Sequence, residues 1–155
     1  MLDRLKALLG GDELPPLHHW GREDVEVAAA ALLVEAARVD GRIDPEERAL
    51  IADLLGRRFG LDPAAARELM DFGARESERS VELHHFAHVI TQRFAEAARI
   101  ELIEMLWAVV YADGVATDFE VNLMRRIGGL LYVEDKDRGA ARQRVLARLG
   151  RAPPG

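Results

Sequence analysis

The sequence predicts an all-α fold, a bundle of seven or eight helices arranged as two pseudo-symmetric halves. Apolar residues recur three and four positions apart along most of the 155 residues, and no stretch alternates convincingly as a strand would. Two runs, at 25–39 and 102–111, are apolar nearly all round, which is typical of helices at the centre of a bundle. A segment repeated within the chain indicates the two halves.

The individual elements follow from helix start and stop signals. Residues 1–23 are predicted to form an N-terminal helix at 2–9 and a linker arm rich in glycine and proline. The helical domain then covers 24–150, and the tail 151–155 is predicted to be disordered. The helices expected in the domain are 24–39, 45–59, 63–75, 81–94, 96–112, 118–133 and 135–149. The aromatic residues expected in its core are Phe59, Phe86, Phe94, Trp107, Tyr111 and Tyr132.

Composition excludes several classes of chemistry. The chain has no cysteine, which rules out disulfides, thiolate metal sites and cysteine nucleophiles. It also lacks the serine elbow of hydrolases, a phosphate-binding loop and a dinucleotide fingerprint. A net charge of −6 disfavours nucleic acid as a partner. We therefore expect a protein that is not an enzyme. A metal-dependent hydrolase is the least favoured alternative, because no general base stands apart from the acids that shape the loops.

An internal repeat appears when the chain is shifted by 73 residues, so that Val34–Phe59 lies over Trp107–Tyr132. Five of the 26 aligned positions are identical, and three of these five fall in one window with the pattern D-G-x-x-x-x-x-E. The two windows, 40–47 and 113–120, hold seven of the 27 acidic residues and one arginine. They therefore carry a charge equal to that of the whole chain.

One interpretation of the windows is purely structural. Each window joins a buried helix to an amphipathic one, and its glycine is expected to end the first helix with a positive φ. Asp44 and Thr117 then stand as N-caps of the second helices, with Glu47 and Glu120 three residues later. This is the spacing of a capping box, in which both side chains bond to backbone N–H groups at the start of a helix.

The other interpretation is a divalent-cation site. The spacing matches the second half of an EF-hand loop, but the acidic positions of the first half hold Ala36 and Arg38, or Val109 and Tyr111, so an autonomous EF-hand is excluded. A cation would require the two loops to meet and pool their carboxylates. Such oxygen ligands suit Ca²⁺, Mg²⁺ or Mn²⁺. The candidate metal ligands are Asp40, Asp44, Glu47, Asp113, Asp118 and Glu120.

The pairing of A-R-V-D-G-R-I-D-P-E-E (37–47) with Y-A-D-G-V-A-T-D-F-E (111–120) resembles the TerB family. These are TerB-like tellurite-resistance proteins, related to the N-terminal domain of a membrane-anchored DnaJ-type co-chaperone. The resemblance spans about 25–149 and implies an all-helical fold of two similar halves. It also implies a metal-binding role for Asp40, Asp44, Glu47, Asp113 and Glu120, and a link to tellurite or stress response. The second copy departs from the first by having Thr117 in place of Asp44.

Three histidines form a second candidate for metal binding. His84 and His88 share a helix face, a spacing that can chelate zinc or nickel, but His85 stands where a zincin would have glutamate. The alternative is a set of partly exposed histidines at the start of a helix.

Five arginines and no acid occur between Arg138 and Gly155. One interpretation is a surface helix whose cations are favoured near its C-terminus by the helix dipole. The other is an anionic partner, which is an acidic protein, a phosphate-bearing molecule or a membrane surface, bound through the Arg138–Arg151 helix. The helix at 2–9 is expected either to dock on its own bundle or to exchange between subunits of a homo-oligomer. Since no signal peptide or apolar run of about 20 residues is present, we expect a cytoplasmic protein, with peripheral attachment at the inner membrane as the alternative.

Overall fold

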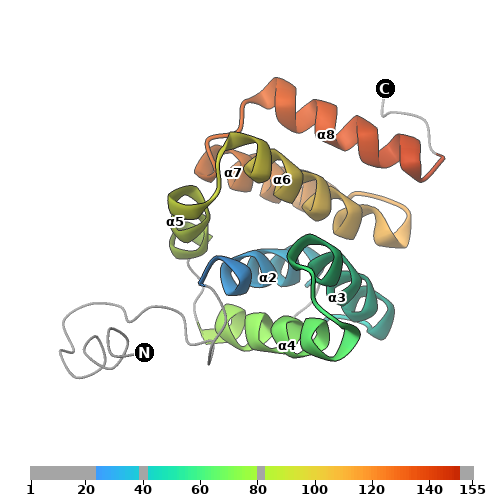
Figure 1. Cartoon of the computed structure of the whole chain (residues 1–155). Coiled ribbons are helices and arrows are strands. Elements are labelled where there is room, and N and C mark those ends of the chain that lie inside the picture. Colours follow the sequence, from blue (N-terminus) through green and yellow to red (C-terminus); the bar gives the residue numbers. More distant parts are fainter. Residues whose placement is uncertain (1–23, 39–41, 80–82, 151–155) are drawn as a thin grey trace.

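The computed structural model describes residues 24–38, 42–79 and 83–150 (Figure 1). These ranges form a seven-helix bundle, which confirms the all-α prediction. The pseudo-symmetry of its two halves stays a prediction. The helices are α2 (Asp24–Ala37), α3 (Pro45–Phe59), α4 (Pro63–Arg79), α5 (Leu83–Arg93), α6 (Glu96–Val110), α7 (Asp118–Leu130) and α8 (Asp135–Arg148), with a 3-10 turn, η1 (Tyr111–Asp113), between α6 and α7.

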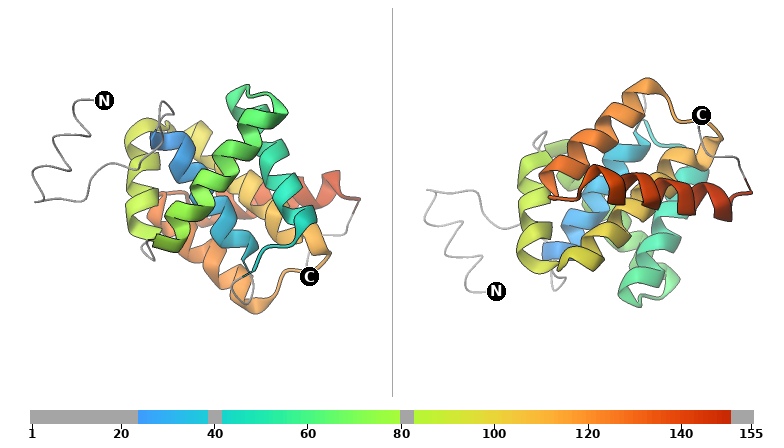
Figure 2. Two further views of the ribbon diagram at one scale, coloured as in Figure 1. Left: turned by 90° about the horizontal axis from the view of Figure 1, so that it is seen from below. Right: turned by 90° about the horizontal axis from the view of Figure 1, so that it is seen from above.

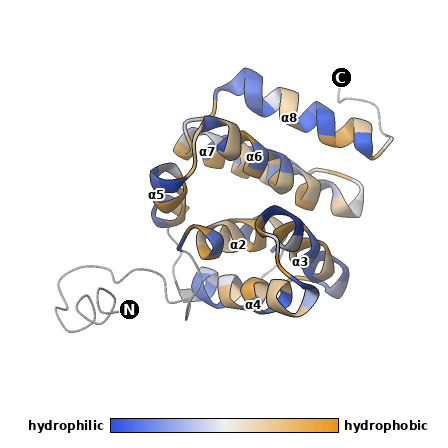
Figure 3. Ribbon diagram, in the orientation of Figure 1, coloured by the Kyte–Doolittle hydropathy of each residue, from blue (hydrophilic) through white to orange (hydrophobic). Residues whose placement is uncertain are grey.

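Helix α2 lies at the centre of the bundle. Every residue from Val27 to Val34 is completely buried, and the helix contacts α3, α4, α5, α6 and α7. Figure 3 shows α2 as predominantly hydrophobic and α8 as predominantly hydrophilic. A helix that is apolar nearly all round can bury its whole circumference only when other helices surround it, so the sequence pattern correctly places α2 inside.

The crossing of α2 and α4 is unusually close. A Cβ atom added to Gly73 of α4 would lie 2.5 Å from the Cβ of Ala30 and 2.9 Å from the backbone of α2. Glycine facing alanine thus lets the two helices approach, because no larger pair of side chains fits between them. On the opposite side of the molecule, α8 packs on α6 through its buried residues Ala141, Val145 and Leu146 (Figure 1).

Helix α4 continues one turn beyond the predicted end at residue 75. The last turn looks polar in the sequence, but Glu76 and Ser77 are buried. The Ser77 hydroxyl donates a hydrogen bond to Glu35 of α2 and accepts one from Arg38 at 3.1 Å. These contacts between α2 and α4 supply partners for polar groups that the sequence alone would place in solvent.

The end of α7 also differs from the prediction, which continued the helix to residue 133. Tyr132 adopts a left-handed backbone with φ 57°, and the Val133 N–H bonds back to the Gly128 carbonyl at 2.9 Å. This is the closure of a Schellman motif, and it ends the helix. The expectation that Tyr132 fills the core is wrong, since its side chain is 75% exposed. The left-handed turn directs it away from the buried face of α7.

The other predicted core aromatics lie inside or at the edge of the core. Phe86, Trp107 and Tyr111 are buried, whereas Phe59 and Phe94 are half-buried and pack against the core. The predicted N-terminal helix and arm at 1–23 and the predicted tail at 151–155 lie outside the described residues. Among the helices that are described, none is long and apolar enough to cross a membrane.

Candidate functional site

The first acidic window leads into α3 through a complete capping box. Asp44 has the extended backbone of an N-cap, and its Oδ1 accepts a hydrogen bond from the Glu47 N–H at 2.9 Å. Glu47 Oε1 in turn accepts from the Asp44 N–H at 3.4 Å. Pro45 occupies the first helical position, where its missing N–H has no consequence. The predicted cap is thus confirmed, while Asp40 and Gly41 lie outside the described residues.

The second window has the same construction with a different capping side chain. Gly114 ends η1 with φ 106°, as predicted from the need for a left-handed residue there. The Thr117 hydroxyl accepts from the Glu120 N–H and donates to Glu120 Oε1, both at 3.1 Å. Glu120 Oε1 also accepts from the Thr117 N–H at 2.9 Å. A hydroxyl can donate and accept, whereas the carboxylate of Asp44 only accepts, so threonine adds one bond to this box.

The six predicted metal ligands occupy different environments. Asp44 and Asp118 are exposed, Glu47 is half-buried, and Glu120 is only 5% exposed. Asp113 belongs to η1, but its side chain, like the whole of Asp40, lies outside the described part of the chain. Within that part, no three acidic or histidine side chains gather in a way that could hold a metal ion. The ligand set therefore stays a prediction.

The two windows follow helices that run in the same direction. Helices α2 and α6 pack against each other, and Figure 2 shows both crossing the bundle with their C-terminal ends toward the same side. The described parts of the windows, 42–47 and 113–120, consequently lie toward one end of the molecule. The sharing of one ion by the two loops stays a prediction.

A polar cluster holds the end of α2 just before the first window. Arg38 Nη1 lies 3.2 Å from Glu35 Oε1 and 3.1 Å from the Ser77 hydroxyl, and Ser77 is 2% exposed. The cluster ties the last turn of α2 to α4, so the chain leaves the core at a defined point. Sequence reasoning missed it. The only signal was a Glu–Arg pair three residues apart at the end of a helix that is apolar after its first turn.

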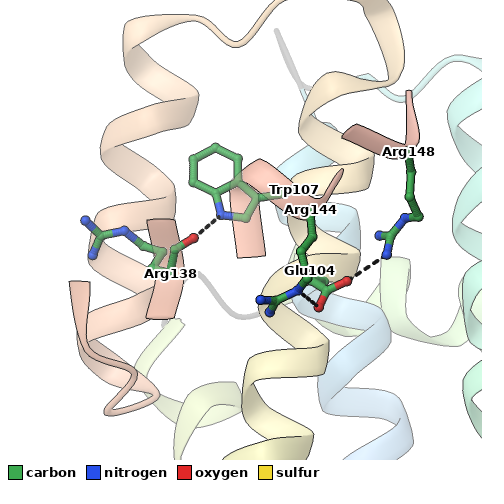
Figure 4. Close-up of polar contacts among 5 residues, drawn as sticks. All are labelled: Glu104, Trp107, Arg138, Arg144 and Arg148. Atoms are coloured by element: carbon green, nitrogen blue, oxygen red, sulfur yellow. Dashed lines mark hydrogen bonds and ion pairs between the residues drawn. The ribbon is translucent and has the colours of Figure 1, made fainter. Parts of the chain in front are cut away.

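The second window is held from the other side by α8. The rings of Trp107 and Tyr111 stack with their centroids 5.9 Å apart. Arg142 of α8 lies over the Trp107 ring at 4.8 Å, and its Nε donates to the Tyr111 hydroxyl at 2.8 Å. The Trp107 Nε1–H donates to the Arg138 carbonyl at 3.2 Å (Figure 4). Since Tyr111 begins η1, these contacts fix the chain immediately before Asp113.

Two further arginines of α8 converge on one carboxylate of α6. Glu104 accepts hydrogen bonds from Arg144 Nε and Arg148 Nη1, each at 2.8 Å (Figure 4). Burial by itself raises the pKa of the Glu104 carboxyl, but the bonds and positive charges of the two arginines outweigh it and lower the pKa below its ordinary value. Four of the five predicted arginines thus bond within the molecule: Arg138, Arg142, Arg144 and Arg148. An anionic partner for this helix stays a prediction.

The three histidines lie on α5. His84 and His88 are exposed and His85 is half-buried, with its ring centroid 5.9 Å from that of Phe86. This exposure agrees with the interpretation of solvated histidines at the start of a helix. No third ligand joins them among the described residues.

Comparison with known proteins identifies a family. Residues 26–143 match the model of the family described as tellurite resistance protein TerB. No curated protein and no solved structure matches the chain. The matched region covers most of the described bundle and includes both acidic windows, their capping boxes and the helices that hold them.

Proposed function

The chain belongs to the TerB family of tellurite resistance proteins, and from this premise we propose that it is a non-catalytic module of the tellurite or stress response whose two acidic windows bind a divalent cation. The observation that carries the proposal is the repeated Asp-Gly pair four residues before each N-cap, at 40–41 and 113–114. A capping box needs its N-cap and its third residue. A capping box therefore does not explain why Asp40 and Asp113 precede the N-caps.

The chemistry of the donor set selects the class of ion. All six candidate ligands are carboxylates, and the chain contains no cysteine. Hard oxygen ligands favour Ca²⁺, Mg²⁺ or Mn²⁺ over softer metals. Because the boxes engage Asp44, Glu47 and Glu120 at helix starts, we assign the principal ligand role to Asp40 and Asp113. The exposed carboxylate of Asp118 is a third ligand outside the boxes.

Calorimetric titration of the chelator-stripped protein with Ca²⁺, Mg²⁺, Mn²⁺ and Zn²⁺ tests this proposal. We expect binding of at least one of the first three ions, and a loss of about tenfold or more in affinity in the double variant Asp40→Asn/Asp113→Asn. Asp71→Asn, an exposed acid of α4 that pairs with Arg48, is the control and should bind as the wild type does. Absence of heat with every metal, or unchanged binding by the double variant, would refute the proposal.

A second candidate function is an interaction scaffold in which the windows serve only to start helices. The two complete capping boxes favour it, since they account for Asp44, Glu47, Thr117 and Glu120 without any ion. It predicts that Thr117→Ala lowers the free energy of unfolding by about 1 kcal/mol and that Thr117→Ser has little effect. It also predicts that added metal changes the free energy of unfolding of neither variant. Stabilisation by metal that disappears in Asp40→Asn/Asp113→Asn would contradict this candidate.

A further inference from the structure

One face of α7 is exposed along its whole length and carries an unusual set of side chains. Phe119, Asn122, Arg126 and Gly129 are spaced three and four residues apart, so they share one side of the helix, and all four are exposed. Phe119 is 67% exposed although most large aromatic side chains are covered in folded proteins. We call these four residues together with Tyr132 the α7 face.

Tyr132, at the end of this face, occupies a backbone conformation that normally belongs to glycine. Helix α3 ends with the same closure, in which Leu61 N–H bonds back to the Gly56 carbonyl at 2.9 Å, and there the left-handed residue is Gly60 with φ 64°. In α7 the equivalent position holds tyrosine with φ 57°. A residue with a Cβ is strained in this conformation. Tyr132 is 75% exposed, so packing of its side chain in the core does not offset the strain. Backbone strain that no packing offsets indicates that the side chain is kept for a function.

The charge of this face is positive at its middle. Arg125 donates to Asn122 Oδ1 at 2.8 Å, and Arg126 is exposed beside it. Among the described residues, no carboxylate forms an ion pair with either arginine. The arginines of α8 differ, since Arg138, Arg144 and Arg148 all pair with carboxylates. Exposed arginine between exposed aromatics is the composition that recurs at the energetic centres of protein interfaces.

We propose that the α7 face docks an acidic amphipathic helix of a partner protein. Apolar side chains of that helix pack on Phe119 and Tyr132, and carboxylates between them pair with Arg126. Phe119 and Leu130, the last residue of α7, are 11 residues apart, which corresponds to roughly 17 Å along the helix axis and therefore to about three turns of a partner helix. Tyr132 follows in the left-handed turn beyond Leu130. A Cβ at Gly129 would meet no atom within 4 Å, so this part of the face is open to the backbone of a partner.

A protein partner fits better than a membrane surface. An anionic bilayer is an extended charged plane, and the net charge of −6 opposes its approach as a whole. A single helix contacts only the local charge, since more distant groups are screened beyond about 8 Å at physiological salt. The local charge is positive at Arg125 and Arg126 in the middle of the face and negative at its ends, where Asp118 and Glu134 are exposed, so the carboxylates of the partner belong between the two aromatics. Phe119 lies within the second acidic window, next to Asp118, so binding is measured both with and without a cation.

The test uses the full-length chain and a fluorescent helical peptide of about 18 residues. The peptide carries leucines spaced to reach Phe119 and Tyr132, with glutamates between them, and its isomer has lysine in place of each glutamate. Fluorescence polarisation, run both in chelator and in Ca²⁺, measures the two affinities. We expect micromolar binding of the glutamate peptide under both conditions and binding at least about tenfold weaker for the lysine isomer.

Three variants and one control make the result specific. Phe119→Ala and Arg126→Glu should each weaken binding of the glutamate peptide about tenfold or more. Tyr132→Gly should also weaken it, yet raise the urea midpoint of unfolding because it relieves the left-handed strain. Arg67→Glu alters an exposed arginine of α4 and should change nothing. Equal binding of both peptides, or equal effects of Arg126→Glu and Arg67→Glu, would overturn the proposal.

Two other outcomes would also overturn the proposal, because they would identify a different occupant of the α7 face. Sedimentation of the protein with phosphatidylglycerol vesicles that is lost in Phe119→Ala, without binding of the peptide, would make the occupant a lipid surface. A dimer in light-scattering chromatography that Phe119→Ala converts to a monomer would make the occupant a second copy of this chain.

Discussion

Single side chains on α6 and η1 determine how α8 is held. Glu104 receives both Arg144 and Arg148, and Trp107 and Tyr111 receive Arg142. The two sets differ in electrostatic character. The first pairs a partly buried carboxylate with two cations, and the second places a cation on aromatic rings, where its attraction does not depend on pH. Of the two sets, only the first should contribute a pH-dependent part to the stability of the protein.

Replacing Glu104 with glutamine should lower the free energy of unfolding near neutral pH by about 1 kcal/mol, because two charge-assisted bonds become neutral ones. Folding lowers the pKa of this carboxyl, so its contribution is complete above the ordinary value of 4.5 and is lost as the pH falls through the lower folded-state pKa. Urea unfolding as a function of pH should show the difference between wild type and Glu104→Gln shrinking toward acid. Glu101→Gln, at a carboxylate 59% exposed, is the control. If the difference in free energy of unfolding stayed constant at every pH, Arg144 and Arg148 would not be stabilising the charged form of Glu104.

At the scale of elements, both ends of α3 and α7 are defined locally, whereas the helix crossings are not. Helices α3 and α7 both start with a capping box and end with a left-handed residue, and these features involve residues close in sequence. The crossing of α2 and α4 depends instead on Ala30 and Gly73, which are 43 positions apart. Nothing in the sequence near either residue shows that the other will meet it.

Gly73→Ala should lower the free energy of unfolding by about 1–3 kcal/mol, because its Cβ would overlap Ala30 and the two backbones must separate. Gly139→Ala on α8 is the matched control, since its Cβ would meet no atom within 4 Å. There the higher helix propensity of alanine should raise stability by about 0.5–1 kcal/mol. Chemical denaturation of both variants measures the two effects. If both substitutions changed the free energy of unfolding in the same direction, the α2–α4 crossing would not be as tight as described.

At the scale of the whole molecule, α2 makes the bundle one cooperative unit. Each of the five helices from α3 to α7 contacts it, and its completely buried residues join both sides of the core. A helix shared in this way leaves no group of helices with a separate core. We therefore expect the described bundle to unfold in one transition.

Leu33→Ala should lower the free energy of unfolding by about 2–5 kcal/mol, since Leu33 is completely buried and the cavity cannot collapse among packed helices. In a Trp20→Phe background, fluorescence of Trp107 reports on α6 while circular dichroism reports on all helices, and the two curves should coincide. Leu149→Ala, at a side chain 47% exposed, should change stability by less than about 0.5 kcal/mol. Two separate transitions would show that the halves fold independently.

Much of the fold could be predicted because its signals are local. The all-α class, the placement of α2 and α6 inside, the bounds of α3 and the capping boxes all depend on spacings of three, four or a few residues. The left-handed Gly114 belongs to the same group. Physical contacts between neighbours on one helix determine these features, and periodicity records those neighbours directly.

The remaining features depend on residues brought together from distant parts of the chain. The extra turn of α4 exists because Ser77 meets Glu35 and Arg38. The arginines of α8 contact the rest of the bundle because Glu104, Trp107 and Tyr111 lie within their reach. The sequence predicts that Tyr132 is a core aromatic, whereas its side chain is exposed in the structure. The sequence by itself determined where helices begin and which faces are apolar. The tertiary structure decided which polar and aromatic groups are covered, because burial depends on neighbours that only folding supplies.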